Sequence, residues 1–153
     1  MVLVRMAAIF ALVLGVTPQA NSARTSQVDL VLQAITDPPS RGYPGMEFGL
    51  LAELKSAGSQ ASPATTVDFY LRRKTGTRVL IGTSKVLRLA SGRISLPRET
   101  LNLPQSLAAG AFAMEACVDT ANRIFERSES NNCVTARSMT QVVERGPDVP
   151  PDY

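Results

Sequence analysis

Residues 46–55 read Met-Glu-Phe-Gly-Leu-Leu-Ala-Glu-Leu-Lys, and the expected architecture of the chain follows from this decapeptide. Apolar residues stand at every second position from Met46 to Leu54, and most positions between them hold a charged residue or Gly. Successive side chains of a β-strand point to opposite faces, so this period of two predicts a strand with one buried face. A helix over the same residues would put Glu47 and Leu54 on one side, so the strand is favoured.

The same alternation recurs further along the chain. A predicted strand over 65–71 has three apolar residues on one face, and residues 112–118 repeat the pattern. Shorter apolar segments, bounded by turn residues such as Gly, Pro and Asp, predict further strands at 28–35, 78–83 and 133–136. An extension of the last strand to Val143 is left open. These segments predict an all-β fold, an antiparallel β-sandwich of about seven strands, with no helix longer than one or two turns.

Two segments allow more than one interpretation. Residues 106–116 are rich in Ala, which favours a helix, but Gly110 and the alternation that follows it favour a strand. Between Ile94 and Leu103 the apolar residues are interrupted by Pro97, and Pro cannot donate to a central ladder. The pairing of this second segment is left open.

Both ends of the chain are set apart from a predicted domain over residues 28–137. Residues 1–23 have the order of a secretory signal peptide, with a basic Arg5, an uncharged apolar run and small residues up to Ala23. A membrane anchor is the alternative, but the apolar run is too short, because a spanning helix needs about 20 residues. Residues 138–153 contain several Pro residues and predict a disordered C-terminal tail.

Composition argues against several classes of function. The chain has no His, which removes the usual base of Ser and Cys nucleophiles and the commonest zinc ligand. It contains no Gly-x-Ser-x-Gly, Ser-x-x-Lys or phosphate-binding Gly loop. The formal net charge is only +3, and the basic cluster over 72–74 is typical of a solvated turn, so nucleic-acid binding is not indicated. We therefore predict a non-catalytic protein with no cofactor.

The most specific segment of the chain runs from Cys117 to Cys133. It contains Asp, Asn, an apolar residue, Glu and a final Glu-x-Asn-Asn in a fixed order. These positions are Asp119, Asn122, Ile124, Glu126, Glu129, Asn131 and Asn132. In this order the segment resembles the last hairpin of the CARDB family, the cell-adhesion-related domain found in bacteria.

The resemblance extends over most of the chain, from residue 28 to residue 137. The family's successive strands and turns are similar to residues 28–31, 44–45, 69–71 and 103–112. Ser56 departs from the family, which commonly has Asn before the Ala57-Gly58 pair, and residues 84–99 match poorly. The resemblance implies an immunoglobulin-like sandwich of two antiparallel sheets, found in exported proteins and associated by name with adhesion.

The polar residues of the hairpin suit a structural role. Asp119 and Asn122 favour a tight connection, because their side chains bond nearby backbone groups and tolerate left-handed geometry. The pair Asn131-Asn132 suits the entry into the last strand for the same reason. The carboxylates of Glu126 and Glu129 are expected to accept backbone N–H groups across the loop.

Calcium binding is the alternative for the same hairpin. Its carboxylates and amide carbonyls are hard oxygen donors of the kind that calcium prefers. However, the spacing matches no EF-hand loop, and the charges of Arg123 and Arg127 oppose a bound cation. We therefore predict a structural motif and no metal site.

Cys117 and Cys133 are the two cysteines of the chain. If Ala116 and Val118 point inward, Cys117 points outward, and the same alternation around Val134 points Cys133 outward on the neighbouring strand. Both thiols then flank one hairpin on one face, which predicts a disulfide in an exported protein. Free thiols or a redox pair are the weaker alternatives, because no Cys-x-x-Cys spacing is present.

The predicted function is that of an exported, non-catalytic binding or adhesion-type module that engages a protein or a cell-surface glycan. We expect it in the bacterial periplasm or outside the cell, with no transmembrane segment after signal cleavage and no nucleic-acid partner. A structural spacer or assembly domain of an envelope complex is the alternative. A hydrolase that uses carboxylates is a more remote one.

Overall fold

The computed structural model describes residues 27–73, 76 and 78–144, and every regular element in them is a strand. The strands are β1 (Leu30–Ile35), β2 (Arg41–Gly42), β3 (Glu47–Ser56), β4 (Thr65–Arg72), β5 (Arg78–Val86), β6 (Ile94–Ser95), β7 (Arg98–Asn102), β8 (Gly110–Val118) and β9 (Cys133–Val142). These described residues include no apolar helix of membrane-spanning length. The predicted signal peptide over 1–23 lies outside them, as does the last part of the predicted tail.

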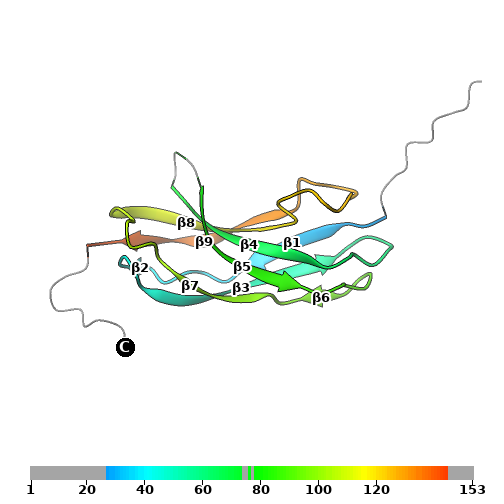
Figure 1. The fold of residues 1–153 in the computed structure, drawn as a ribbon, viewed down its shortest axis with the longest axis horizontal. Coiled ribbons are helices and arrows are strands. Elements are labelled where there is room, and N and C mark those ends of the chain that lie inside the picture. The colour runs from blue at the N-terminus through cyan, green and yellow to red at the C-terminus, as the bar shows by residue number, and fades with distance from the viewer. Residues whose placement is uncertain (1–26, 74–75, 77, 145–153) are drawn as a thin grey trace, which may run out of the picture.

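The strands form two facing sheets (Figure 1). One sheet is built around β3, which pairs with β1 on one side and with β6 and β7 on the other. The other sheet has the order β2-β9-β8-β4-β5. Every pair is antiparallel except that of β2 with β9. The predicted all-β, immunoglobulin-like sandwich is confirmed.

The decapeptide over 46–55 forms most of β3, as its alternation predicted. Its alternate apolar residues from Phe48 to Leu54 are buried against the second sheet. That sheet contributes the inward faces of β4 and β8, where Phe69 and Met114 are both fully buried. Because each such side chain contributes about 1.5–3 kcal/mol, the two inward faces supply most of the stabilisation.

Proline accounts for two interruptions of the strands. Pro38 and Pro39 follow β1, and the chain then crosses to the other sheet, where β2 pairs in parallel with β9. Pro97 separates β6 from β7, which pair with opposite ends of β3. The carbonyl of Pro97 still accepts the N–H of Ala52 at 2.9 Å, so both pieces continue one edge. The pairing left open over 94–103 is therefore that of an edge strand broken by Pro97.

The boundary between domain and tail differs from the prediction. Strand β9 continues to Val142, close to the extension to Val143 that the sequence left open, so residues 138–142 belong to the domain and not to the predicted disordered tail over 138–153. Val142 is fully buried, and Gln141 donates its N–H to the carbonyl of Ser40 at 2.9 Å. This partner segment precedes β2 and is far away in the sequence, so local composition could not reveal the pairing.

Candidate functional site

The β8–β9 loop, residues 119–132, contains the polar residues that the sequence pointed to. Asp119 and Asn122 have φ angles of 46° and 47°, in the left-handed region that Asp and Asn adopt more readily than other side chains. The Asp119 carboxylate accepts the N–H groups of Arg123 at 3.3 Å and Ile124 at 2.8 Å. Asn122 donates its own N–H to the Asp119 carbonyl at 2.8 Å. These two residues form the tight turn that follows β8.

Glu126 ties the loop to the first strand. Its side chain is buried, and Oε2 accepts the backbone N–H of Leu30, the first residue of β1, at 2.5 Å. Oε1 accepts Nδ2 of Asn132 at 3.0 Å. The carboxylate thus supplies an acceptor for the N–H at the start of an edge strand, as buried backbone groups require.

The remaining residues of the motif gather around Glu126. Glu129 accepts the Glu126 N–H at 3.2 Å and Nδ2 of Asn132 at 2.9 Å. Asn131 donates Nδ2 to the carboxylate of Asp29, 102 positions away, at 3.0 Å. The structure therefore places the motif against the beginning of β1, a long-range contact that loop chemistry alone did not reveal.

The environment of Glu126 changes its acidity. Burial raises the pKa of Glu126 from its ordinary value of 4.5 to about 7, and the negative charges of Glu129 and Asp119 act in the same direction. The hydrogen bonds from Leu30 and Asn132 favour the charged form and oppose this rise in the pKa. The carboxyl group of Glu126 therefore changes between its neutral and its charged form near neutral pH.

The calcium alternative would need loop oxygens that a cation can use. The carboxylates of Asp119, Glu126 and Glu129 already accept hydrogen bonds within the fold. Only the amide oxygens of Asn131 and Asn132 are buried without a donor in this loop. Among the described residues, no group of three acidic, Cys or His side chains is arranged to hold a metal ion. The loop oxygens act mainly as internal hydrogen-bond acceptors.

Cys117 and Cys133 form a disulfide between directly paired residues of β8 and β9. Cys133 is exposed, whereas Cys117, which was expected to point outward as well, is only 1% exposed. Cys117 pairs with Asp68 on β4, and Nη1 of Arg78 on β5 lies 3.2 Å from its sulfur. The side chain of Arg78, two strands away from β8 in the sheet, contacts the outward-facing sulfur, which the alternation of β8 alone could not show.

A cluster of charged and aromatic side chains surrounds that sulfur on the outer face of the five-stranded sheet. This outer-face cluster consists of Asp68, Tyr70, Arg72, Arg78 and Glu115. Glu115 is 7% exposed and accepts Arg72 at 3.2 Å and Arg78 at 3.1 Å. The guanidinium of Arg78 also lies 4.1 Å from the centre of the Tyr70 ring. The sequence predicted a solvated turn at Arg72 and carried no sign of the cluster, because the cluster forms only when β4, β5 and β8 pair.

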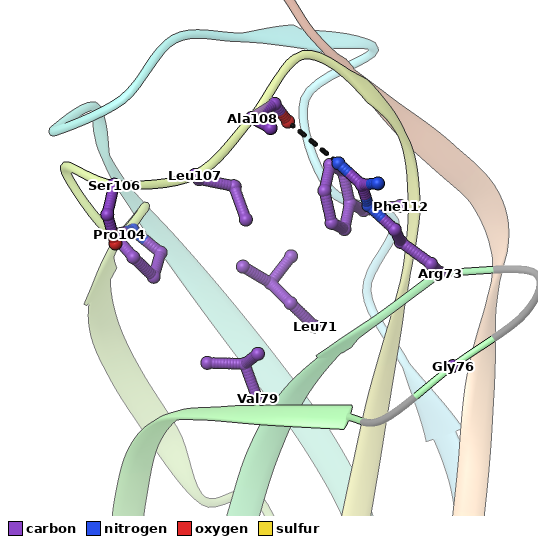
Figure 2. Close-up of a pocket in the computed structure, with 9 residues that line it drawn as sticks. All are labelled: Leu71, Arg73, Gly76, Val79, Pro104, Ser106, Leu107, Ala108 and Phe112. Atoms are coloured by element: carbon purple, nitrogen blue, oxygen red, sulfur yellow. Dashed lines mark hydrogen bonds between the residues drawn. The ribbon is translucent and has the colours of Figure 1, made fainter.

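An apolar hollow of about 340 Å³ lies at the opposite end of β8 from the loop. Figure 2 shows the side chains that line it, among them Leu71, Val79, Leu107 and Phe112. Arg73 stands at its rim, with its guanidinium 5.0 Å from the centre of the Phe112 ring. The same guanidinium donates to the carbonyl of Ala108 at 3.3 Å. No sequence signal marked this hollow, because its lining comes from four separate segments.

A second hollow, of about 560 Å³, lies against the β8–β9 loop. Charged side chains contribute to its lining, with Asp68, Lys85, Asp119 and Arg123 among them. Asp68 and Asp119 are already engaged in hydrogen bonds within the fold. This second hollow therefore offers a ligand fewer free groups than its volume implies.

Comparison with known proteins gives one family and one architecture. The CARDB family model matches residues 27–136. The CARDB domain of a Pyrococcus furiosus protein, solved in complex with di-metal ions, is 20% identical, with a TM-score of 0.56 over 77% of this chain and 96% of that one. A domain of a Methanosarcina acetivorans protein assigned to the cell surface is 21% identical, with a TM-score of 0.56 over 80% of this chain and 97% of that one. No curated protein matches the sequence.

An enzyme also contains a similar domain. A β-glucosidase from Erythrobacter marinus is 13% identical, with a TM-score of 0.54 over 76% of this chain. The matched region is only 16% of the length of that enzyme. At this level of identity the likeness shows the fold and carries no information about activity.

Proposed function

Because this chain belongs to the CARDB family, a family of non-catalytic, adhesion-related domains, we propose that it binds a partner protein outside the cytoplasm. The disulfide between Cys117 and Cys133 supports this compartment, because such bonds persist in oxidising surroundings. The lack of His in the sequence supports a role without catalysis. The partner class and the binding surface follow from the apolar hollow.

The apolar hollow is the observation that carries the proposal. Leu71 and Val79 are paired residues of β4 and β5, and Leu107 reaches the same space from the connection between β7 and β8 (Figure 2). Val79 is 42% exposed, so part of this apolar lining remains open to solvent. A hollow of this kind suits one large apolar side chain of a partner, whose burial contributes about 1.5–3 kcal/mol.

Strand β5 places the hollow beside a free edge of the sheet. Among the described strands, β5 is the last of its sheet and pairs only with β4. An extended segment of a partner adds to such an edge through main-chain hydrogen bonds. A bulge at Ile81 interrupts the pairing with β4, and bulges protect edges from strand addition. We therefore expect the partner segment to pair with residues 78–80 of β5, which include Val79.

Arg73 gives the site a preference for negative charge. Its guanidinium is bonded to the carbonyls of Ala108 at 3.3 Å and Ala109 at 3.4 Å, and to no carboxylate among the described residues. A partner carboxylate beside the apolar side chain would form a charge-assisted hydrogen bond at this rim. The expected ligand is an extended peptide segment with a large apolar residue and an acidic neighbour.

Selection of a random peptide library on the purified chain tests this proposal. Enriched peptides are expected to share a large apolar residue with an acidic residue next to it. Val79→Asp puts a charge into the hollow and should weaken their binding at least tenfold, or about 1.4 kcal/mol. Isothermal titration calorimetry with one enriched peptide measures this difference.

Leu80→Asp is the matched control for this experiment. Leu80 follows Val79 in β5 and is 53% exposed, but it is not part of the lining of the hollow. It should leave the affinity within about threefold, which is less than 1 kcal/mol. Equal losses in both variants would remove the hollow from the proposal. Failure to enrich any peptide class would favour a structural spacer instead.

A further inference from the structure

The disulfide has two unequal sulfur atoms. Cys133 is exposed to solvent, whereas Cys117 is 1% exposed beneath the outer-face cluster. In thiol–disulfide exchange a thiolate attacks one sulfur atom and the other sulfur atom leaves, and access decides which atom is attacked. We therefore expect a thiol from solution to reach the sulfur of Cys133 and not that of Cys117.

The guanidinium of Arg78 lies beside the sulfur of Cys117, which would leave as a thiolate. Its Nη1 lies 3.2 Å from Sγ of Cys117 and 3.1 Å from Oε2 of Glu115. Contact with the ring of Tyr70 at 4.1 Å further holds the guanidinium in place. A fixed positive charge at this distance stabilises a thiolate, and a more stable thiolate leaves faster.

The other charged groups that face Cys117 are already satisfied. The two oxygen atoms of Glu115 are bound by Arg72 and Arg78, one to each. Asp68, which pairs with Cys117 across the sheet, accepts the hydroxyl groups of three residues: Tyr70, Thr83 and Thr120. Arg78 is therefore the charged side chain in direct contact with the leaving sulfur atom.

We propose that this disulfide is a site of directional thiol–disulfide exchange, in which an external thiolate attacks Cys133 and Cys117 departs as the thiolate. The attacking sulfur forms a new bond to Sγ of Cys133, the bond between Cys133 and Cys117 breaks, and its electron pair remains on Cys117. A second external thiol then resolves the mixed disulfide, so two thiols are oxidised to a disulfide and both cysteines are reduced.

Exchange at this site acts on the loop and leaves the core intact. The disulfide closes the connection between β8 and β9, while the buried residues of both sheets lie on the inward faces. The hydrogen bonds of Glu126 to Leu30 and Asn132 do not depend on the sulfur atoms. Reduction is therefore expected to loosen the β8–β9 loop without unfolding the sandwich.

Reduced glutathione and the oxidised full-length chain provide the test. After an acid quench and alkylation of free thiols, peptide mass spectrometry should find glutathione on Cys133 and the alkyl group on Cys117. Arg78→Gln should slow formation of this adduct about threefold to tenfold, because the leaving thiolate loses its cation. Arg78→Lys keeps a positive charge and should restore part of the rate.

Arg72→Gln is the matched control. Arg72 binds the same Glu115 carboxylate, but its guanidinium contacts oxygen and not sulfur. It should leave the rate within about twofold of the original chain. Glutathione on Cys117, equal slowing in Arg72→Gln and Arg78→Gln, or exchange that requires global unfolding would each overturn the proposal.

Discussion

The two ends of the sandwich differ in the side chains that cover them. At one end, the β8–β9 loop covers the start of β1 with polar side chains whose bonds are mostly made inside the fold, such as that from Leu30 to Glu126. At the other end, the connection between β7 and β8 leaves apolar side chains around an open hollow. These ends lie at opposite termini of β8, which runs between them (Figure 1). The second hollow beside the loop is lined by charged groups that are partly engaged within the fold, so we call the loop end the closed end and the end with the apolar hollow the open end. We expect the closed end to contribute mainly to stability and the open end to carry the proposed binding.

Removing the central carboxylate of the closed end should have the largest effect on stability. Glu126→Ala leaves the buried N–H of Leu30 without its acceptor, and leaves the amide of Asn132 with Glu129 alone as an acceptor. Because an unsatisfied buried group costs about 1–3 kcal/mol, the free energy of unfolding should fall by about 3 kcal/mol. Chemical denaturation at pH 5 measures this change.

Glu129→Ala is the matched control for that change. Glu129 lies in the same loop and also accepts hydrogen bonds from Glu126 and Asn132, but its side chain is exposed. Water can replace its bonds, so we expect a loss of about 1 kcal/mol or less. If the two variants lose the same stability, burial at Glu126 does not distinguish the closed end.

Opening the disulfide should have the next largest effect. Replacement of both Cys117 and Cys133 by Ser removes a covalent closure of sequence separation 16. The loop-entropy model gives a loss of about 3 kcal/mol at most for a loop of this size. Hydrogen exchange should rise in residues 119–132 and stay unchanged around the hollow. Equal rises at both ends would mean that the ends are not independent.

The closed end should also respond to pH. The folded-state pKa of Glu126 is about 7 against an ordinary 4.5, so the folded chain binds more protons than the unfolded chain between these values. Stability from this group is therefore fully present below about pH 4.5 and is lost as the pH rises towards 7. We expect a fall of about 2 kcal/mol across that window, measured by denaturation at a series of pH values.

Glu126→Gln tests the origin of that pH dependence. Gln keeps the size of the side chain and does not titrate, and its carbonyl can still accept the N–H of Leu30. Asn132 can rotate its amide to receive the new NH₂ group, because its Oδ1 has no donor in the described structure. The variant should fold and lose the fall in stability between pH 4.5 and 7. A pH profile unchanged by this substitution would assign the dependence to another group.

The sequence predicted local structure better than contacts between distant segments. Alternation over 46–55 identified β3 and its buried face, because a strand with one wet face carries that pattern in its own residues. Asp119 and Asn122 were recognised as turn residues because left-handed geometry is a local preference. Both predictions needed only neighbours in the chain.

The misses share one physical cause. Glu126 was expected to bond within its loop, but its backbone partner outside the loop is Leu30, 96 positions away. Residues 138–142 read as a tail because their neighbours in the segment before β2 are equally remote. The burial of Cys117 depends on Arg78 of β5, a strand that does not pair with β8. Such contacts depend on the topology of the sheets, which composition and periodicity do not encode.

The smallest effect on stability is expected at the open end, and it separates the two ends most sharply. Val79→Asp changes a residue that is 42% exposed on an edge strand, so it should lower the free energy of unfolding by about 1 kcal/mol or less. The same variant is expected to weaken peptide binding at least tenfold, or about 1.4 kcal/mol. Glu126→Gln should show the reverse, with an altered pH profile of stability and unchanged peptide affinity. Thermal unfolding of both variants measures their stability, and calorimetry with one peptide measures the affinity of each variant for it. A Val79→Asp protein as unstable as Glu126→Ala would show that the hollow is part of the structural core, and the functional division between the ends would not hold.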